Sequence, residues 1–365
     1  MNYPFIDRHI HIFLKSYSKS NKPLDLALGN YFRTHKSLGS KDRRIMGDTI
    51  FGMARWKSLI DHFSPKDPVS FYRNLDFKRM DQDASIPPFA KLGLSKFIYK
   101  ELVKHYGKKE AHRLAKILNE PAPMTIRANL LKTTQEHLLK IFQKGTPCKD
   151  APAGIQFEKR EPLFSLPEFK EGLFEVQDEG SQLLAEGVKA SPGDTVLDYC
   201  SGSGGKTLAF APQMRGSGQI YLHDVRKNAL LEARKRLKRA GVQNAQRLEP
   251  EHRQLKRLIG KCDWVLIDVP CSGTGTLRRN PDQKWKIDEE MVNALVEKQR
   301  EIIRIAINYL KPGGTLVYGT CSLLPQENEA QVKYILENSS LNLEKEKLLL
   351  PVSGGMDGFF FASFK

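Results

Sequence analysis

Four short apolar runs alternate with helical patterns between residues 190 and 340, and this alternation constrains the fold more than any other feature of the sequence. The runs predict strands at 194–199, 219–223, 263–268 and 315–318, with helices beginning near Lys206, Arg226, Asp288 and Gln326. Strands that alternate with helices in this way form a parallel sheet covered on both faces, so we predict an α/β, doubly wound fold. Ligands of such sheets bind beyond the carboxyl ends of the strands, where the loops after these runs are expected to lie.

The first run leads into a glycine-rich turn, LDYCSGSGGKT at residues 197–207, that resembles a phosphate-binding loop. A phosphate loop needs a glycine five residues before the glycine of its Gly-Lys-Thr, and Cys200 stands at that position. The dinucleotide pattern G-x-G-x-x-G fails as well, because Gly202 and Gly204 are followed by Thr207 where a third glycine should stand. The turn therefore suits an adenosine-containing ligand that places no phosphate on it, and an ATPase is the weaker alternative.

The chain is strongly basic, and its charge is uneven. Its 58 Lys+Arg against 42 Asp+Glu give a net charge of +16 over 365 residues. Residues 1–120 carry 23 basic and 12 acidic side chains, a net of +11, which leaves +5 for the remainder. This excess predicts a polyanionic partner such as nucleic acid, and a basic surface kept only for solubility is the alternative.

An acid stands at the end of the second run, where sheets of this kind contact the ribose of an adenosine ligand. Asp224 lies about 20 residues after the glycine turn, and its carboxylate can accept hydrogen bonds from both ribose hydroxyls. A simple helix cap is the alternative interpretation. The helix that follows is basic, and we expect most of its charges to be solvated and a few to meet RNA phosphate: Arg226, Lys227, Arg234, Lys235, Arg236, Lys238 and Arg239.

Two further strand ends carry cysteines. The run at 263–268 ends in Asp268, and Pro270 then stiffens a turn that bears Cys271. The run at 315–318 is followed by Thr320 and Cys321. A single cysteine is more often a small buried apolar residue, but two thiols and a carboxylate at the carboxyl ends of strands predict a reactive site.

This combination suits methylation of a pyrimidine. Carbon 5 of the ring is a poor nucleophile until a thiolate adds to carbon 6 and gives an enamine that attacks an electrophilic methyl group. Asp268 can stabilise the charge at ring nitrogen 3 if burial raises its pKa. A second thiol suits the later loss of the proton from carbon 5. S-adenosylmethionine is an adenosine-containing methyl donor without phosphate, as the glycine turn requires.

These residues resemble the Sun-type RNA cytosine methyltransferases, which form 5-methylcytosine. The similarity rests on DVPCSGTGTLRRNPDQKW (268–285) and GTCSLLPQENE (319–329), and it extends to VQDEGSQL (176–183) and to DGFFFASF near the C-terminus. LGSKDRRIMGDTIFGMARW (38–56) is similar to the helical RNA-binding domain of bacterial ribosomal-RNA members. The resemblance implies a Rossmann-like methyltransferase domain that uses S-adenosylmethionine, with ribosomal RNA as the favoured substrate and transfer RNA as the alternative.

The resemblance also assigns roles to the site residues. It makes Cys321 the nucleophile and Cys271 the cysteine that assists product release. Asp268 contacts the base and borders the donor, and Asp224 binds the donor ribose. The donor-wrapping turn comprises Cys200, Ser201, Gly202, Ser203, Gly204, Gly205 and Lys206.

Two departures from the family pattern bear on donor binding. The family turn usually reads Cys-Ala-Ala-Pro-Gly-Gly-Lys-Thr, and here Ser201, Gly202 and Ser203 replace the middle three residues. Backbone amides do most of the holding, so we expect binding to persist. The family also places an aspartate before the Asp268 strand to meet the adenine amino group, and by spacing Glu249 is the candidate here.

Three regions are expected along the chain. Apolar residues three and four apart, such as Leu94, Ile98 and Leu102, predict a basic, helical, RNA-binding domain over 1–120. Short β-like runs around a helix that begins near Thr133 predict a small α+β module over 121–178. The methyltransferase domain is then expected over 179–365.

The remaining features predict a cytoplasmic protein without metal or membrane contact. The cysteines at 148, 200, 262, 271 and 321 form neither C-x-x-C pairs nor a disulfide pattern. An export signal is not evident, and no apolar stretch of about 18 residues occurs. His9 and His11 lack partners at ligand spacing, so no metal site is expected. A non-catalytic RNA-binding ribosome assembly factor on the same fold is the alternative from another class, but such a factor could lose either cysteine and both are present.

Overall fold

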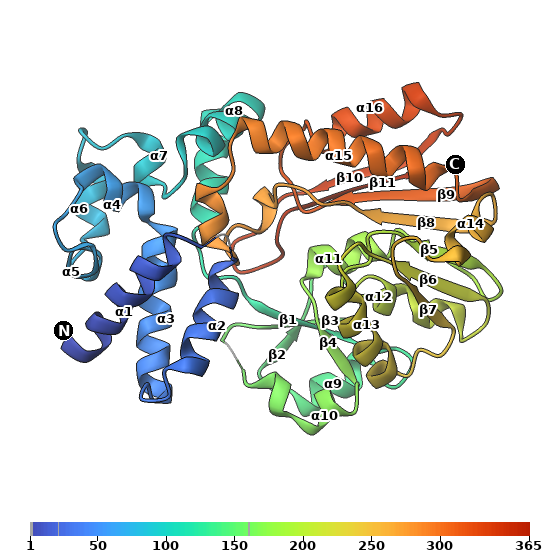
Figure 1. Cartoon of the computed structure of the whole chain (residues 1–365), viewed down its shortest axis with the longest axis horizontal. Coiled ribbons are helices and arrows are strands. Elements are labelled where there is room, and N and C mark those ends of the chain that lie inside the picture. The colour runs from blue at the N-terminus through green and yellow to red at the C-terminus, as the bar shows by residue number, and fades with distance from the viewer. Residues whose placement is uncertain (1–2, 21, 160) are drawn as a thin grey trace. The chain divides into compact units, whose positions relative to one another are not determined.

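The computed structural model describes residues 3–20, 22–159 and 161–365 (Figure 1). These residues form two compact units. The helical unit comprises Met1–Pro121 and Thr276–Glu289, and the sheet unit comprises Ala122–Gly275 and Glu290–Lys365. Within the described part of the chain, none of the helices combines the length and the apolar character needed to span a bilayer.

The helical unit is built from helices, and α1 to α5 share one core. α1 shows the principle, because Ile6, Ile10 and Phe13 recur at helical spacing and all are buried. Asp67 starts α5 by accepting hydrogen bonds from the backbone at Val69 and Ser70 at 3.0 and 3.1 Å. The helices are α1 Pro4–Tyr17, α2 Leu24–Thr34, α3 Ser40–Arg55, α4 Lys57–Phe63, α5 Pro68–Arg73, α6 Phe77–Gln82, α7 Pro88–Lys91 and α8 Lys96–Ile117.

The segment Thr276–Glu289 belongs to the helical unit although it is remote in sequence. Trp285 donates its indole N–H to the carbonyl of Ala54 at 2.6 Å. The ammonium of Lys284 is fully buried and donates to Asn119 Oδ1 at 2.5 Å. Burial, with the charge of a nearby arginine, lowers the pKa of Lys284 well below its ordinary value. The segment that follows the Cys271 turn is thus anchored among the N-terminal helices.

The sheet unit begins with a small antiparallel sheet of order β2-β3-β1-β4. Buried apolar residues of its strands pack against Leu138 of α9. The elements are β1 Met124–Ala128, α9 Gln135–Ile141, β2 Gly145–Pro147, β3 Gly154–Phe157, α10 Pro167–Lys170 and β4 Phe174–Val176.

The larger sheet has the order β10-β11-β9-β8-β5-β6-β7. Strands β5 to β9 pair in parallel, whereas β11 runs antiparallel to both β9 and β10. The four expected strands are confirmed as β5, β6, β8 and β9, and three further strands complete the sheet. The strands are β5 Thr195–Asp198, β6 Gln219–His223, β7 Ala245–Leu248, β8 Cys262–Asp268, β9 Leu310–Thr320, β10 Leu343–Leu349 and β11 Phe359–Phe364.

Helices cover both faces of this sheet, which confirms the doubly wound α/β fold (Figure 1). One core joins α11, α12 and α13 to side chains such as Val196 and Leu266, and the other joins α14, α15 and α16 to their neighbours Leu197 and Val265. Adjacent residues of one strand therefore face opposite cores. The helices are α11 Glu179–Ala185, α12 Thr207–Phe210, α13 Lys227–Ala240, α14 Arg253–Leu258, α15 Glu289–Ile307 and α16 Glu329–Asn338.

Candidate active site

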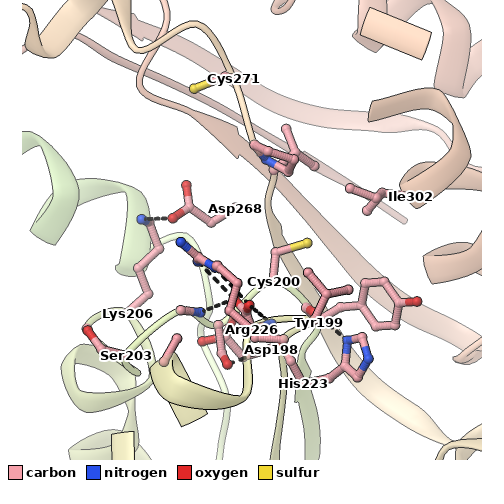
Figure 2. A pocket seen from close by; sticks show the side chains of 18 of the residues that line it. Asp198, Tyr199, Cys200, Ser203, Lys206, His223, Arg226, Asp268, Cys271 and Ile302 are labelled. Carbon is pink, nitrogen blue, oxygen red and sulfur yellow. Dashed lines mark hydrogen bonds and ion pairs between the residues drawn. The ribbon is translucent and has the colours of Figure 1, made fainter. Parts of the chain in front are cut away.

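A cavity of about 1000 Å³ lies at the carboxyl ends of β5, β6 and β8 in the sheet unit (Figure 2). Most of the predicted site residues line it. The loops that bear them leave neighbouring parallel strands at the same edge of the sheet, as a doubly wound topology requires. The predicted residues on its wall are Cys200, Ser201, Gly202, Ser203, Gly205, Lys206, Asp224, Asp268, Cys271 and Cys321.

The glycine turn between β5 and α12 owes its shape to two glycines. Gly202 and Gly204 have φ values of 54° and 77°, which favour glycine over residues with a Cβ. A Cβ at Gly204 would lie 3.2 Å from Leu222, so this glycine also permits close packing beneath the turn. Gly204 is not among the residues that line the cavity, unlike the rest of the predicted turn.

Asp224 holds the turn from the β6 side. Its carboxylate accepts the backbone N–H of Gly202 at 2.8 Å and the backbone N–H of Arg226 at 2.8 Å. The Arg226 guanidinium donates to both carboxylate oxygens at 3.0 Å. Burial alone would raise the pKa of Asp224, but these hydrogen bonds outweigh it and lower the pKa. Arg226, not Asp224, occupies the N-cap position of α13.

Asp198, the last residue of β5, lines the cavity but was not among the predicted site residues. It is fully buried and accepts the Thr207 hydroxyl at 2.7 Å. Its other oxygen, Oδ1, has no hydrogen-bond partner among the residues that the structure describes. Burial raises the pKa of Asp198 to about 7. The sequence could have indicated Asp198 as a site residue, because it is the last residue of the first strand and comes just before the turn that ends in Gly-Lys-Thr.

Lys206 and Asp268 form an ion pair on the wall of the cavity, and a dashed line marks it in Figure 2. The Asp268 side chain is 31% exposed, so burial does not isolate it as the sequence suggested. Its partner is a cation that is itself only 11% exposed. Burial alone would lower the pKa of Lys206, but the ion pair with Asp268 outweighs that effect and raises it.

The two predicted cysteines meet at the ends of adjacent strands. β8 and β9 are parallel, and Asp268 pairs with Gly319 in their register. The loops that follow bring Cys271 Sγ to 3.4 Å from Cys321 Sγ, and the backbone N–H of Cys321 donates to Cys271 Sγ at the same distance. The hydrogen bond with Cys321 and burial raise the pKa of the Cys271 thiol well above its ordinary value.

A buried carboxylate ties the two cysteine loops together. Glu327 is fully buried and accepts the Ser272 hydroxyl and the Ser322 hydroxyl, each at 2.5 Å. It also accepts the Ser272 backbone N–H at 2.8 Å and the Gln299 amide at 3.0 Å. Ser272 and Ser322 directly follow Cys271 and Cys321, so one side chain fixes the residue after each thiol.

Glu249, like Gly204, is a predicted site residue that does not line the cavity. Its side chain is 56% exposed and pairs with Lys227 at 3.2 Å. Pro250 and Glu251 line the cavity wall instead, and Glu251 has a φ of 65°. The turn after β7 therefore directs the second acid of Glu-Pro-Glu, rather than the first, toward the cavity.

The arrangement defines a class of protein. A parallel sheet with a glycine turn after its first strand and an acid after its second is the adenosine-binding half of a Rossmann-like fold. Two thiols follow the next strand ends on the wall of the same cavity. Together they define a Rossmann-like methyltransferase fold.

The chain belongs to the RsmB/F methyltransferase family. The model of the family described as 16S rRNA methyltransferase RsmB/F matches residues 186–365, and that of an RsmF/B-like, ferredoxin-like domain matches residues 94–163. This family consists of S-adenosylmethionine-dependent methyltransferases, in agreement with the expected cofactor.

Individual proteins also resemble the chain in sequence. Ribosomal RNA small subunit methyltransferase B of Escherichia coli (strain 536) is 34% identical over 261 residues, which is 67% of this chain and 60% of that protein. A probable ribosomal RNA small subunit methyltransferase B of Synechocystis is 32% identical, over 71% of this chain and 64% of the relative. The crystal structure of a methyltransferase homolog protein from Pyrococcus horikoshii is 30% identical with a TM-score of 0.66, over 76% of this chain and 96% of that one. The chain thus spans about 60% of the length of the Escherichia coli protein.

Proposed function

We propose that the protein transfers a methyl group from S-adenosylmethionine to carbon 5 of a cytosine in RNA, and that small-subunit ribosomal RNA is the substrate. The observation that carries the proposal is the pair of thiols, Cys271 and Cys321, whose sulfurs lie 3.4 Å apart on the wall of the cavity that Asp224 and the glycine turn also line. The net charge of +11 over residues 1–120 and the printed names of the relatives support an RNA substrate.

The cavity offers a hydrogen-bond acceptor and apolar side chains that suit S-adenosylmethionine. The Asp224 carboxylate suits the ribose hydroxyls, and Val225, Leu255 and Ile302 offer apolar surface to the adenine. Arg226 now contacts Asp224, but its side chain is 69% exposed and can turn to solvent when hydroxyls take its place. When bound, S-adenosylmethionine supplies an electrophilic methyl group.

The chain supplies the activation of the base. The Cys321 thiolate forms a bond to carbon 6 of cytosine, and the displaced electron pair makes carbon 5 nucleophilic. Asp268 contacts the ring at nitrogen 3, where negative charge develops, and passes to that nitrogen a proton that its ion-pair partner Lys206 supplies. After carbon 5 has gained the methyl group, its proton leaves to water and the electron pair of that bond restores the double bond to carbon 6. The bond between carbon 6 and Cys321 breaks and returns the Cys321 thiolate, and nitrogen 3 returns its proton through Asp268 to Lys206.

The division of roles follows the family resemblance, in which the cysteine of GTCSLLPQENE is the nucleophile, so attack is assigned to Cys321. Cys271 is placed to exchange a proton with Cys321 through their hydrogen bond, and we assign it to assisting the elimination step. The net change at the base is replacement of a hydrogen by a methyl group, with release of one proton.

Trapping experiments test these roles. Cys321→Ala should abolish methylation and leave no covalent protein–RNA complex on a denaturing gel. Cys271→Ala should transfer the methyl group and then stall, so that RNA remains bound to Cys321. Cys148→Ala, in a cysteine that does not line the cavity, is the matched control and should behave as the parent. Adducts with Cys321→Ala and none with Cys271→Ala would reverse the roles, and adducts with neither would refute covalent catalysis.

The substrate is tested separately. Bisulfite mapping of total RNA from cells with and without the gene should show a methylated cytosine that is lost from small-subunit ribosomal RNA. A loss confined to transfer RNA would move the assignment to that substrate. RNA that is bound but never methylated, by the parent or any variant, would identify a non-catalytic ribosome assembly factor.

A further inference from the structure

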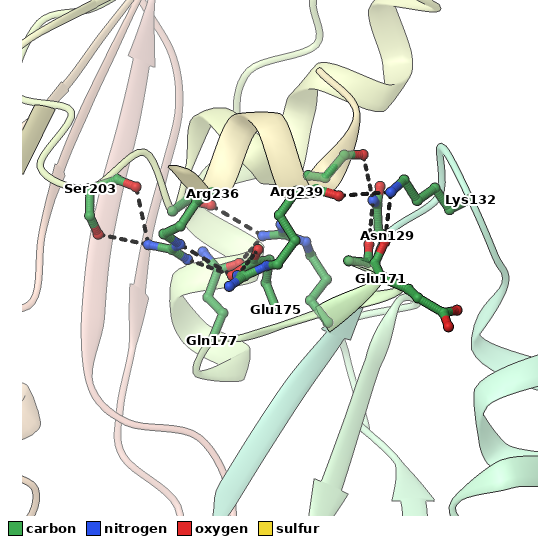
Figure 3. A network of polar contacts seen from close by, with 12 residues as sticks. Asn129, Lys132, Glu171, Glu175, Gln177, Ser203, Arg236 and Arg239 are labelled. Atoms are coloured by element: carbon green, nitrogen blue, oxygen red, sulfur yellow. Dashed lines mark hydrogen bonds and ion pairs between the residues drawn. The ribbon is translucent and has the colours of Figure 1, made fainter. Parts of the chain in front are cut away.

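An arginine of α13 binds the glycine turn at the residue that replaces the usual proline of the Sun-type family. Arg236 of α13 donates through Nη1 to the Ser203 carbonyl at 3.1 Å and to the Ser203 hydroxyl at 2.7 Å (Figure 3). Ser203 stands where the family turn usually has proline, and Gly202 precedes it with a φ of 54°. Glycine and serine leave this stretch freer in the unbound chain than alanine and proline would.

Arg236 is itself fixed by a buried acid of the small antiparallel sheet. Glu175 of β4 has a side chain that is only 4% exposed, and it accepts from Arg236 Nη2 at 3.0 Å and from Nε at 3.2 Å. Arg239, one turn further along α13, donates to the other oxygen of Glu175 at 2.5 Å and stacks on Phe169, with its guanidinium carbon 3.9 Å from the ring centre. These two arginines were expected to be solvated or to meet RNA, and instead they are ion-paired and largely buried (Figure 3).

A second arginine, which belongs to the same sheet as Glu175, contacts the turn two residues later. Arg127 of β1 is buried and donates to the Gly205 carbonyl at 3.2 Å. Burial lowers the pKa of Arg127 to about 10, which leaves it charged at neutral pH. The turn is therefore held from two sides, because the Gly202 N–H donates to Asp224 while the carbonyls of Ser203 and Gly205 accept from arginines.

We propose that Arg236, held in place by Glu175, is a positioning residue for the donor-binding turn and does the work that proline does in the family pattern. Proline restricts the backbone by fixing φ, whereas Arg236 restricts it by binding the carbonyl and hydroxyl of Ser203. The antiparallel sheet thereby contributes to S-adenosylmethionine affinity through Glu175, which does not itself line the cavity. This inference rests on the proposed function, since it takes S-adenosylmethionine as the ligand.

The test is S-adenosylmethionine affinity, measured by titration calorimetry on the full chain. Arg236→Ala should weaken binding about tenfold, because two hydrogen bonds that order the turn are lost. Arg234→Ala, an exposed arginine of the same helix, should leave affinity unchanged. Adding Ser203→Pro to Arg236→Ala should restore most of the lost affinity, because the ring again restricts the turn.

Arg239→Ala separates positioning from general stability. It breaks the Glu175 cluster as Arg236→Ala does, but Arg239 makes no contact with the turn. Both variants should unfold at lower urea concentration than the parent, and only Arg236→Ala should lose donor affinity. Equal losses of affinity in the two variants, or unchanged affinity in Arg236→Ala, would overturn the inference. A parent protein that does not bind S-adenosylmethionine would instead overturn the proposed function.

Discussion

Removing the Glu327 carboxylate should destabilise the sheet unit more than any single change at the protein surface. Glu327→Ala leaves four donors without their acceptor in a region that water does not reach. The two serine hydroxyls can turn to each other, since their oxygens are 3.2 Å apart. The Ser272 N–H cannot, and the Gln299 amide keeps the Pro270 carbonyl as acceptor for only one of its two hydrogens. At about 1–3 kcal/mol for each unsatisfied N–H the loss is about 2–6 kcal/mol.

Glu327→Gln keeps the shape of the side chain and so isolates the charge. Its carbonyl oxygen can still accept from two donors, while its amide must face a hydroxyl that now accepts. Replacing charge-assisted hydrogen bonds by neutral ones should cost about 1–3 kcal/mol. Glu329→Gln, an exposed glutamate two residues away, should change the free energy of unfolding by less than about 0.5 kcal/mol.

Urea unfolding followed by tryptophan fluorescence measures these differences. The same variants should also change the rates at which Cys271 and Cys321 react with iodoacetamide, because Glu327 fixes the residue after each thiol. A Glu327→Ala protein within about 0.5 kcal/mol of the parent and with unchanged alkylation rates would show that the network neither stabilises the unit nor places the thiols.

Three further predictions concern the donor, the pH dependence and the RNA. Asp224→Ala should weaken S-adenosylmethionine binding by about 1.5–3 kcal/mol and leave RNA affinity unchanged, and equal donor affinity in calorimetry would refute the ribose assignment. Burial raises the pKa of Asp198 to about 7 from an ordinary 3.8, so the folded chain holds an extra proton between these values. Its contribution to the free energy of unfolding should therefore fall as pH rises from about 4 to 8, and urea titrations of Asp198→Asn should lack this part of the pH dependence. The combined substitutions Lys36→Gln, Lys41→Gln and Arg44→Gln neutralise three exposed basic residues of the helical unit. They should reduce RNA affinity and flatten its dependence on salt concentration, whereas an unchanged salt slope would mean that these charges serve solubility.

The sequence predicted the parts of the site that follow from strand ends. Parallel strands carry their loops to one edge, so the positions of Asp224, Asp268, Cys271 and Cys321 at or shortly after the ends of their strands were enough to group them. Spacing alone did not distinguish the two acids around Pro250, because a turn with a positive φ decides which of them faces the cavity.

The missed elements and contacts have physical causes. β10 has a charged, exposed sequence because it is an edge strand, and such strands lack the apolar signal of central ones. β7 is short and lies at the other edge. Arg236 was interpreted as solvated because a helix pattern gives the direction of a side chain but not its partner, and Glu175 lies 61 residues earlier in the chain.

The helical unit has a structural task that a deletion experiment would confuse with RNA binding. Lys284 and Trp285 lie in the segment that follows the Cys271 turn, and their partners Asn119 and Ala54 belong to the N-terminal part of the helical unit. Deleting residues 1–120 would expose a buried lysine and the segment around it, so activity could be lost although no phosphate contact had been removed. Substituting exposed basic residues leaves these buried contacts intact. A change in salt dependence in the substituted full chain can therefore be assigned to RNA contacts, whereas the same change in a truncated chain cannot.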